Sequence, residues 1–242
     1  LEVSSVAVIV AATALAAPGA SAQNAAEFYG GKDIKLIVAA GSGGTYAVYA
    51  RLLAAHWKKY IPGQPNIIVQ HMPGGGGIKG ASYLHNVAPR DGSVIGMPLQ
   101  TVAAAQVLQP KAVKHDVRQW QWVGNMTVLR NTVGVWHTSG VRSVADARQK
   151  QLVIGSTGRG GDMFMVPKLA NEMLGTKFKI VLGYRGIRDV DKAIEGGEAQ
   201  GRAGSWLSWK LSHADWVKDG KVRQIFQVGF SRARDLPKTP LM

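Results

Sequence analysis

The chain contains no cysteine among its 242 residues. This absence excludes a disulfide scaffold, a zinc site built on thiolates and a cysteine nucleophile. Acidic residues are also few, since 15 Asp and Glu stand against 29 Lys and Arg and leave a net charge of +14. Such a charge favours an anionic partner: a nucleic acid, a membrane surface or a small acid. With 46% hydrophobic residues, the chain has enough apolar side chains for a folded core and is not intrinsically disordered.

An apolar run near the start of the chain spans residues 6–17 and ends at Pro18. A helix that spans a bilayer needs about 20 apolar residues, so this run is too short to be one. Its length is typical of a signal-peptide core, and the Ala-Ser-Ala sequence that ends at Ala22 provides a small-x-small cleavage pattern. We therefore expect residues 1–22 to be a partial signal peptide, cleaved near Ala22, and the mature protein to be exported.

Short β-rich segments then alternate with segments of helical periodicity. In the first half of the mature chain, strands are expected at residues 34–39, 67–69 and 94–97. In the second half they are expected at residues 132–136, 152–155, 178–182 and 225–228. Helices between them indicate parallel sheets with helices on their faces. Ser143 is placed to cap one of these helices, and Gly175 to end another.

The alternation starts twice, which predicts two α/β lobes of about 100 residues each. The first lobe is expected at residues 23–122 and the second at residues 123–230. A ligand site between two such lobes is a common arrangement.

Three glycine-bearing loops each follow an expected strand, at residues 41–45, 156–161 and 183–186. A loop between a strand and the next helix directs free backbone N–H groups toward a cleft, where they and the helix dipole suit an anion. Glycine also serves tight turns that bind nothing, so any one loop is equally compatible with a structural role. Three such loops favour a ligand held between the lobes. Arg159 would add a charge-assisted hydrogen bond to a carboxylate.

The motifs of common enzyme classes are missing from the sequence. Tyr46 stands where a dinucleotide-binding motif needs its third glycine, and neither Ser42 nor Ser156 has the upstream glycine of a nucleophile elbow. The six histidines show no metal-binding spacing. No basic arm or helix-turn-helix pattern supports nucleic-acid binding. A binding protein is favoured, and an exported enzyme acting on a small anionic metabolite is the alternative.

Several stretches occur in the same order as the motifs of a known family. They are residues 26–32, 61–63, 69–77, 86–92, 155–160, 175–179 and 201–204. Together they resemble the substrate-binding proteins of tripartite tricarboxylate transporters, the Bug or TctC family. The resemblance covers nearly all of residues 26–242. One departure is Ala47, where many members have Asp.

The resemblance implies a two-lobed fold like that of periplasmic binding proteins, with a mostly parallel sheet flanked by helices in each lobe. It implies a monomeric periplasmic receptor that captures a small carboxylated metabolite and delivers it to the permease subunits of a membrane transporter. It implies no catalysis, cofactor or metal. Residues 231–242 would begin a return to the first lobe, and the C-terminal part of that lobe would be missing.

The resemblance also places the expected ligand contacts in the loops described above. In the first lobe they are Gly43, Gly44, Thr45, Gln100 and Thr101. In the second lobe they are Ser156, Thr157, Gly158, Arg159, Gly160, Tyr184 and Gly186.

Overall fold

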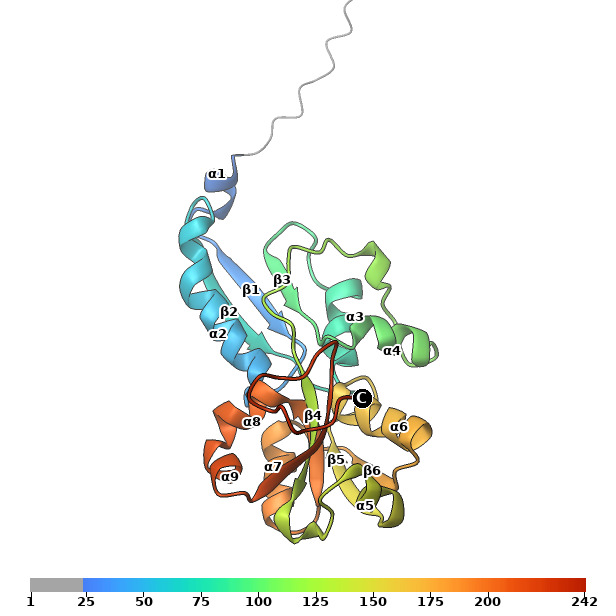
Figure 1. The fold of residues 1–242 in the computed structure, drawn as a ribbon. Coiled ribbons are helices and arrows are strands. Elements are labelled where there is room, and N and C mark those ends of the chain that lie inside the picture. Colours follow the sequence, from blue (N-terminus) through green and yellow to red (C-terminus); the bar gives the residue numbers. More distant parts are fainter. Residues whose placement is uncertain (1–23) are drawn as a thin grey trace, which may run out of the picture.

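The computed structural model describes residues 24–242. The expected signal peptide, residues 1–22, lies outside the described residues. The described chain forms two α/β lobes, one above the other in Figure 1, and the segment that precedes strand β4 connects them. The two-lobed α/β architecture expected from the sequence is therefore confirmed.

The first lobe is built on a three-stranded parallel sheet with β1 in the centre and the strand order β2-β1-β3. Its strands are β1 (Asp33–Val38), β2 (Asn66–His71) and β3 (Val94–Met97). Its helices are α1 (Ala25–Tyr29), α2 (Thr45–Trp57), α3 (Ile78–Asn86) and α4 (Val102–Leu108). The three strands expected in this half of the chain are all present, whereas α1 and α4 were not expected.

The second lobe is built on a five-stranded sheet with the order β6-β5-β7-β4-β8. Its strands are β4 (Asn131–Trp136), β5 (Leu152–Ser156), β6 (Phe178–Leu182), β7 (Gly201–Ser205) and β8 (Val222–Val228). Its helices are α5 (Val144–Gln149), α6 (Asp162–Leu174), α7 (Ile187–Glu195), α8 (Trp206–Ser212) and α9 (Ala214–Lys218). Strand β5 pairs in parallel with β6 and β7, and β4 runs antiparallel to both of its neighbours.

Local sequence signals explain where several elements begin and end. The Ser143 hydroxyl accepts a hydrogen bond from the Asp146 N–H at 3.1 Å and so caps α5, as expected. Gly175 ends α6 with a left-handed φ of 68°, which a residue with a side chain rarely adopts. Strand β7 was not expected, because its sequence Gly-Arg-Ala-Gly-Ser carries no β-branched or alternating pattern. It is buried throughout between β4 and β5, so tertiary contacts specify it.

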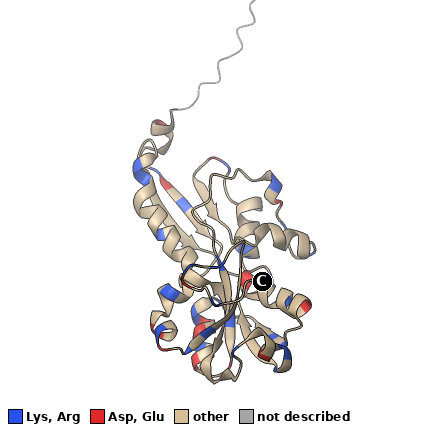
Figure 2. Cartoon of the chain, viewed as in Figure 1, with Lys and Arg blue, Asp and Glu red and all other residues tan. Residues whose placement is uncertain are grey.

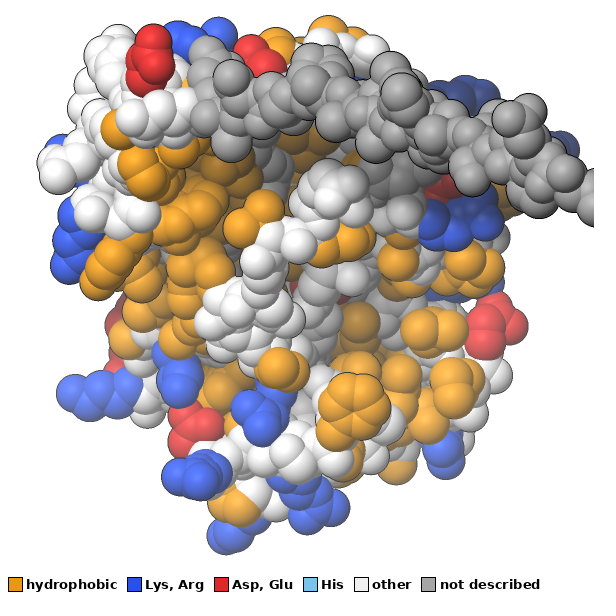
Figure 3. Space-filling view, turned by 90° about the horizontal axis from the view of Figure 1, so that it is seen from above, with side chains coloured by type: hydrophobic (Ala, Val, Ile, Leu, Met, Phe, Trp, Pro, Cys, Tyr) orange, Lys and Arg blue, Asp and Glu red, His pale blue; other side chains and the backbone are white. Residues whose placement is uncertain are grey.

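The second lobe has the larger hydrophobic core. Val133, Leu152, Ile154 and Phe226 belong to one extended cluster of buried side chains there. The main cluster of the first lobe is smaller and centres on Leu36, Val38 and Ala50. Several hydrophobic side chains of the first lobe are exposed, among them Val48, Leu52 and Ile68. Figure 3 shows hydrophobic side chains gathered on the upper face of the molecule.

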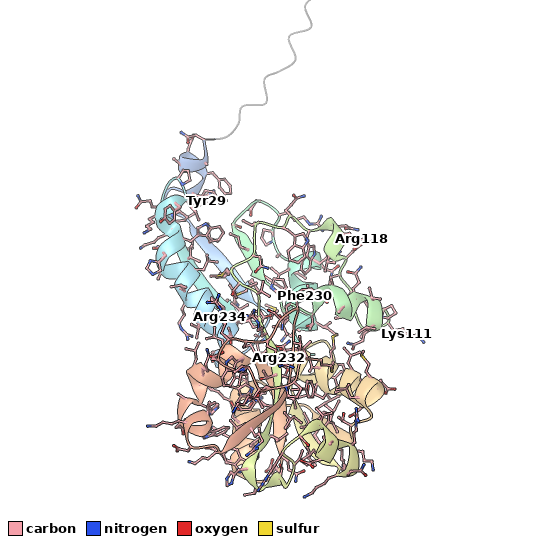
Figure 4. All side chains as sticks on the ribbon, in the orientation of Figure 1. Tyr29, Lys111, Arg118, Phe230, Arg232 and Arg234 are labelled. Atoms are coloured by element: carbon pink, nitrogen blue, oxygen red, sulfur yellow. The ribbon has the colours of Figure 1, made fainter. Side chains whose placement is uncertain are left out.

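The chain after β8 loops round, and its last residues lie beside that strand in parallel. Gln227 and Leu241 form an isolated parallel bridge, and the Met242 N–H donates to the Gln227 carbonyl oxygen at 2.8 Å. Figure 4 shows Phe230 and Arg234, from the same segment, at the level where the two lobes meet. That residues 231–242 begin a return to the first lobe stays a prediction.

None of the described helices is long and apolar enough to cross a membrane. Lysine and arginine are spread over both lobes rather than collected on one face in Figure 2.

Candidate ligand-binding site

A cavity of about 90 Å³ lies where the two lobes meet. A single buried water needs only about 10–15 Å³ on this measure, so the cavity has room for a small organic molecule. The first lobe lines it mainly with the loop from Ala39 to Tyr46 and the glycines that precede α3. The second lobe lines it with Thr157, Asp162, Met163, Arg185, Gly186, Ile187, Gly204, Ser205 and Ser208.

Three helices begin at this cavity without a side-chain cap from the preceding residue. The N-cap residues are Gly44 for α2, Gly161 for α6 and Gly186 for α7, and none of them has a side chain to donate or accept. The first-turn N–H groups of a helix lack intrahelical partners and carry the positive end of the helix dipole. The starts of α2 and α7 therefore suit an anion. The first turn of α6 differs, because the Asp162 carboxylate accepts the Met163 N–H at 2.9 Å there.

Backbone and side-chain hydrogen bonds join the lobes beside the cavity. The Gly160 N–H donates to the Gly75 carbonyl oxygen at 3.0 Å, and the Thr101 hydroxyl donates to the Gly160 carbonyl oxygen at 2.7 Å. The Gln109 side-chain amide donates to the Arg159 carbonyl oxygen at 2.8 Å. These bonds hold the loop before α3 against the loop before α6, so the structure has its lobes closed on one another.

A second contact between the lobes lies at the start of α2. The hydroxyl oxygens of Thr45 and Ser205 are 2.7 Å apart and buried. The Ser205 hydroxyl also accepts from the Ser208 N–H at 3.1 Å and caps α8. Gly43 lies under the side chain of Arg188, because a Cβ at Gly43 would be 2.5 Å from the Arg188 Cγ. A larger residue at position 43 would force the flexible Arg188 side chain to move.

Asp162 and Arg185 are the charged residues among the described ones that line the cavity. Burial raises the pKa of the Asp162 carboxyl above its usual range, although the Met163 N–H and the charge of Arg202 act in the opposite direction. Burial also raises the pKa of the Tyr46 phenol far above its usual value, and the charge of Asp162 adds to this effect. Tyr46 accordingly stays a neutral hydroxyl, which accepts from the Gln100 N–H at 2.8 Å.

A buried ion pair lies behind the cavity. Arg202 on β7 is fully buried and donates to both carboxylate oxygens of Asp191 on α7. The Arg202 guanidinium lies 3.5 Å from the centre of the Trp209 ring, and His213 Nε2 lies 2.7 Å from Asp191 Oδ2. Burial alone would raise the pKa of Asp191, but the charge of Arg202 and the hydrogen bonds from His213 and Arg202 lower it. The cluster fixes β7 against α7, and both elements contribute cavity residues.

The structure brings together some of the residues that the sequence proposed for the site. Gly43, Gly44, Thr45, Thr157 and Gly186 line the cavity. Gln100, Thr101, Gly158 and Gly160 lie beside it, where the lobes touch.

The remaining three candidates lie elsewhere. Arg159 is exposed and outside the lining, and Ser156 is fully buried beneath the loop. Tyr184 packs against the hydrophobic cluster around Val190. Ligand binding by any residue of the set stays a prediction.

Five polar residues of the lining were not proposed from the sequence: Tyr46, Asp162, Arg185, Ser205 and Ser208. Asp162 has the sequence context of an ordinary helix-start residue, which hides its exposure to the cavity. Ser205 is the last residue of β7, whose sequence gives no strand signal, and Ser208 follows it in α8. Arg185 lies inside the third glycine-bearing loop, so its position did carry a signal.

No family model matches the chain. Over 249 aligned residues it is 26% identical to the UPF0065 protein in gbd 5'region of Cupriavidus necator, and the match covers 98% of this chain and 71% of the relative. Its fold is that of two-lobed periplasmic binding proteins. The periplasmic binding protein BugD matches with a TM-score of 0.76 at 17% identity, over 88% of this chain and 71% of BugD.

MatC from Rhodopseudomonas palustris, solved with bound malate, matches with a TM-score of 0.74 at 20% identity, over 87% of this chain and 71% of MatC. The sequence relative and these structures agree with the motifs found along the chain. The resemblance to Bug/TctC-type substrate-binding proteins is therefore confirmed.

Proposed function

We propose that this protein is an extracytoplasmic solute-binding protein that captures a small carboxylate between its two lobes. The observation that carries the proposal is the cavity between the lobes, at which α2 and α7 begin without a side-chain cap and which Arg185 also lines. A carboxylate there would accept hydrogen bonds from backbone N–H groups and lie at the positive ends of helix dipoles. The net charge of +14 would attract such an anion from solution.

Similar structures with bound acids support this proposal. MatC was solved with malate, and Rpa4515 from R. palustris, at 18% identity and a TM-score of 0.66, was solved with adipate. By analogy, residues 23–122 and 123–230 act as the two lobes that close on the solute. The protein works as a monomer in the periplasm and hands its cargo to the permease subunits of a tripartite tricarboxylate-type transporter.

The same similarity favours a receptor over an exported enzyme, because the neighbouring structures are of binding proteins. The described residues that line the cavity include no histidine, and neither Ser205 nor Thr45 has a base as a hydrogen-bond partner. The cavity thus offers groups that hold an acid and no activated nucleophile.

A thermal-shift screen against carboxylic acids tests the proposal. A ligand present at 100 times its dissociation constant adds about 2.7 kcal/mol to the free energy of unfolding, which raises the melting temperature measurably. We expect one class of acid to raise it selectively, and NMR of the recovered ligand to show it unchanged. A folded sample that no acid stabilises would contradict the proposal, and steady turnover of a bound acid would favour the enzyme.

A further inference from the structure

Asp162 is the first residue of α6 and the acidic residue among the described ones that line the cavity. Its Oδ1 accepts the Met163 N–H at 2.9 Å, and its Oδ2 has only a long contact, 3.5 Å from the Gln100 side-chain amide. An ionised carboxylate offers about four acceptor positions. Asp162 lines the cavity and therefore retains unused acceptor positions, chiefly on Oδ2.

Asp162 also lacks a direct cationic partner among the described residues. Arg202 is close enough to stabilise the charged carboxylate, but its hydrogen bonds go to Asp191. A partly buried charge without a paired opposite charge is costly, because the protein interior solvates it poorly. A positive group on a bound ligand would provide the missing partner through a charge-assisted hydrogen bond.

The charged groups that line the cavity are of opposite sign. Arg185 and the starts of α2 and α7 favour a carboxylate, whereas Asp162 repels one. A simple dicarboxylate would bring its second charge toward Asp162. An α-amino acid presents a carboxylate and an ammonium on the same carbon, and both charges then face a group of opposite sign.

We propose that the solute carries a protonated amine in addition to its carboxylate, and that Asp162 selects for that amine. This inference rests on the proposed function, because it assumes that the cavity holds an acid. Asp162 discriminates by attracting the ammonium and by repelling a second carboxylate, so it contributes both to affinity and to specificity.

Calorimetric titration with matched pairs of ligands tests this selection. Each pair is an α-amino acid and the same acid without its amine: L-aspartate and succinate, L-glutamate and glutarate, L-leucine and 4-methylpentanoate, and L-phenylalanine and 3-phenylpropanoate. We expect the wild-type protein to bind the amino acid of at least one pair tenfold or more tightly than its partner. Asp162→Asn keeps the shape and one acceptor oxygen, and it should lower that affinity at least tenfold while changing the affinity for the partner acid less than threefold.

Asp215→Asn is the matched control. Asp215 also lies in the first turn of a helix, α9, but it is exposed and outside the cavity lining. The control should leave both affinities unchanged, and circular dichroism should show that both variants are folded.

The possible outcomes separate this inference from the proposed function. If the acids without an amine bind as well as or better than the amino acids, the selection by Asp162 is overturned and the carboxylate receptor stands. Equal losses for both members of a pair in Asp162→Asn would also overturn it, since Asp162 would then only support the start of α6. If the folded protein binds neither series, the proposed function fails and the inference fails with it.

Discussion

The α-carbon of Gly76 in the first lobe lies against the backbone of Gly158 in the second. A Cβ on Gly76 would be 2.6 Å from the Gly158 carbonyl oxygen and nearer still to the Gly161 nitrogen. Gly158 meets the loop around Gly76 just as closely from the other side. Glycine at these two positions therefore serves the contact between the lobes as well as the proposed anion site. Only residues without side chains allow the two backbones to approach this closely.

Gly76→Ala should hold the lobes apart and weaken ligand binding at least tenfold. The added methyl group overlaps backbone atoms of the second lobe, which cannot move aside as a flexible side chain would. Closure of lobes around a ligand is what completes such a site. Calorimetric titration gives the affinity, and small-angle X-ray scattering in saturating ligand should show a larger radius of gyration than for the wild type.

The control for this variant is Gly75→Ala. Gly75 and Gly76 have similar left-handed φ angles, 61° and 68°, so an alanine is strained by a similar amount at either position. A Cβ on Gly75 would meet only the Ile78 Cβ, at 3.4 Å within the same lobe. Equal losses of affinity in the two variants would mean that backbone strain, and not contact between the lobes, is responsible.

Arg185→Ala should lower the affinity for a carboxylate by about 10- to 150-fold. The estimate assumes one hydrogen bond to a charged group, worth about 1.5–3 kcal/mol, because Arg185 lines the cavity. Arg159 is exposed like Arg185 but does not line the cavity, so Arg159→Ala should change the affinity less than twofold. A larger loss of affinity in Arg159→Ala than in Arg185→Ala would contradict this prediction. It would mean that the ligand binds beside the loop at residues 156–161 and not in the cavity.

Asp162→Asn should raise the stability of the unliganded protein at neutral pH. Burial raises the pKa of this carboxyl, so the folded protein holds its proton more tightly than the unfolded chain does. The ionised carboxyl therefore destabilises the folded protein. This loss of stability begins as the pH rises above 3.8, the pKa of Asp162 in the unfolded chain, and is complete above its raised pKa in the folded protein. Urea denaturation should therefore show a gain for the variant at pH 7 and almost none at pH 3.

A variant that is less stable than the wild type at both pH values would contradict this expectation. It would show that the Asp162 carboxylate is needed to hold the Met163 N–H at the start of α6. The stability of Asp162→Asn should be compared with its ligand affinity. A residue that lowers the stability of the unliganded protein but raises its affinity for the ligand is typical of a functional position.

Much of the fold can be predicted from local sequence, but the polar residues that line the cavity from the second lobe cannot. Runs such as the one at residues 178–182 gave strand β6 with the same bounds, because a β-branched, apolar segment between turns has few alternatives. Arg202 and Ser205 lie on β7, which forms only because β4 and β5 surround it. No local pattern marks such a strand, so its polar residues could not be assigned to the site.

For the glycine-bearing loops too, the sequence predicts some cavity residues but not the direction of every side chain. Their positions at strand ends predicted Gly43, Gly44 and Thr45 as cavity residues, and these do line it. Arg159 points away because its neighbours, Gly158 and Gly160, are held by the opposite lobe. The direction of a side chain in a loop depends on such contacts, which a single sequence does not reveal.

Arg202→Met should destabilise the protein by about 3–5 kcal/mol, the usual effect of removing one partner of a buried ion pair. Arg202 and Asp191 are 0% and 3% exposed, so water cannot replace the lost hydrogen bonds. Adding Asp191→Asn to the same chain removes the unpaired charge and should recover part of the loss. Denaturant unfolding of the single and double variants measures both effects.

The exposed ion pair between Lys210 and Asp235 is the control for the buried pair between Arg202 and Asp191. The Lys210 Nζ and Asp235 Oδ2 atoms are 2.6 Å apart, but the side chains are 42% and 49% exposed, so Lys210→Met should lower the free energy of unfolding by less than about 1 kcal/mol.

The two pairs should also differ in their dependence on pH. Arg202 lowers the pKa of Asp191 in the folded protein, so the stability from the buried pair is present above pH 3.8 and is lost as the pH falls through that lower pKa. Arg202→Met should therefore flatten the acid limb of the stability profile, whereas Lys210→Met should leave most of it in place. An equal loss in both variants at pH 7 would mean that the buried cluster does not hold β7 against α7.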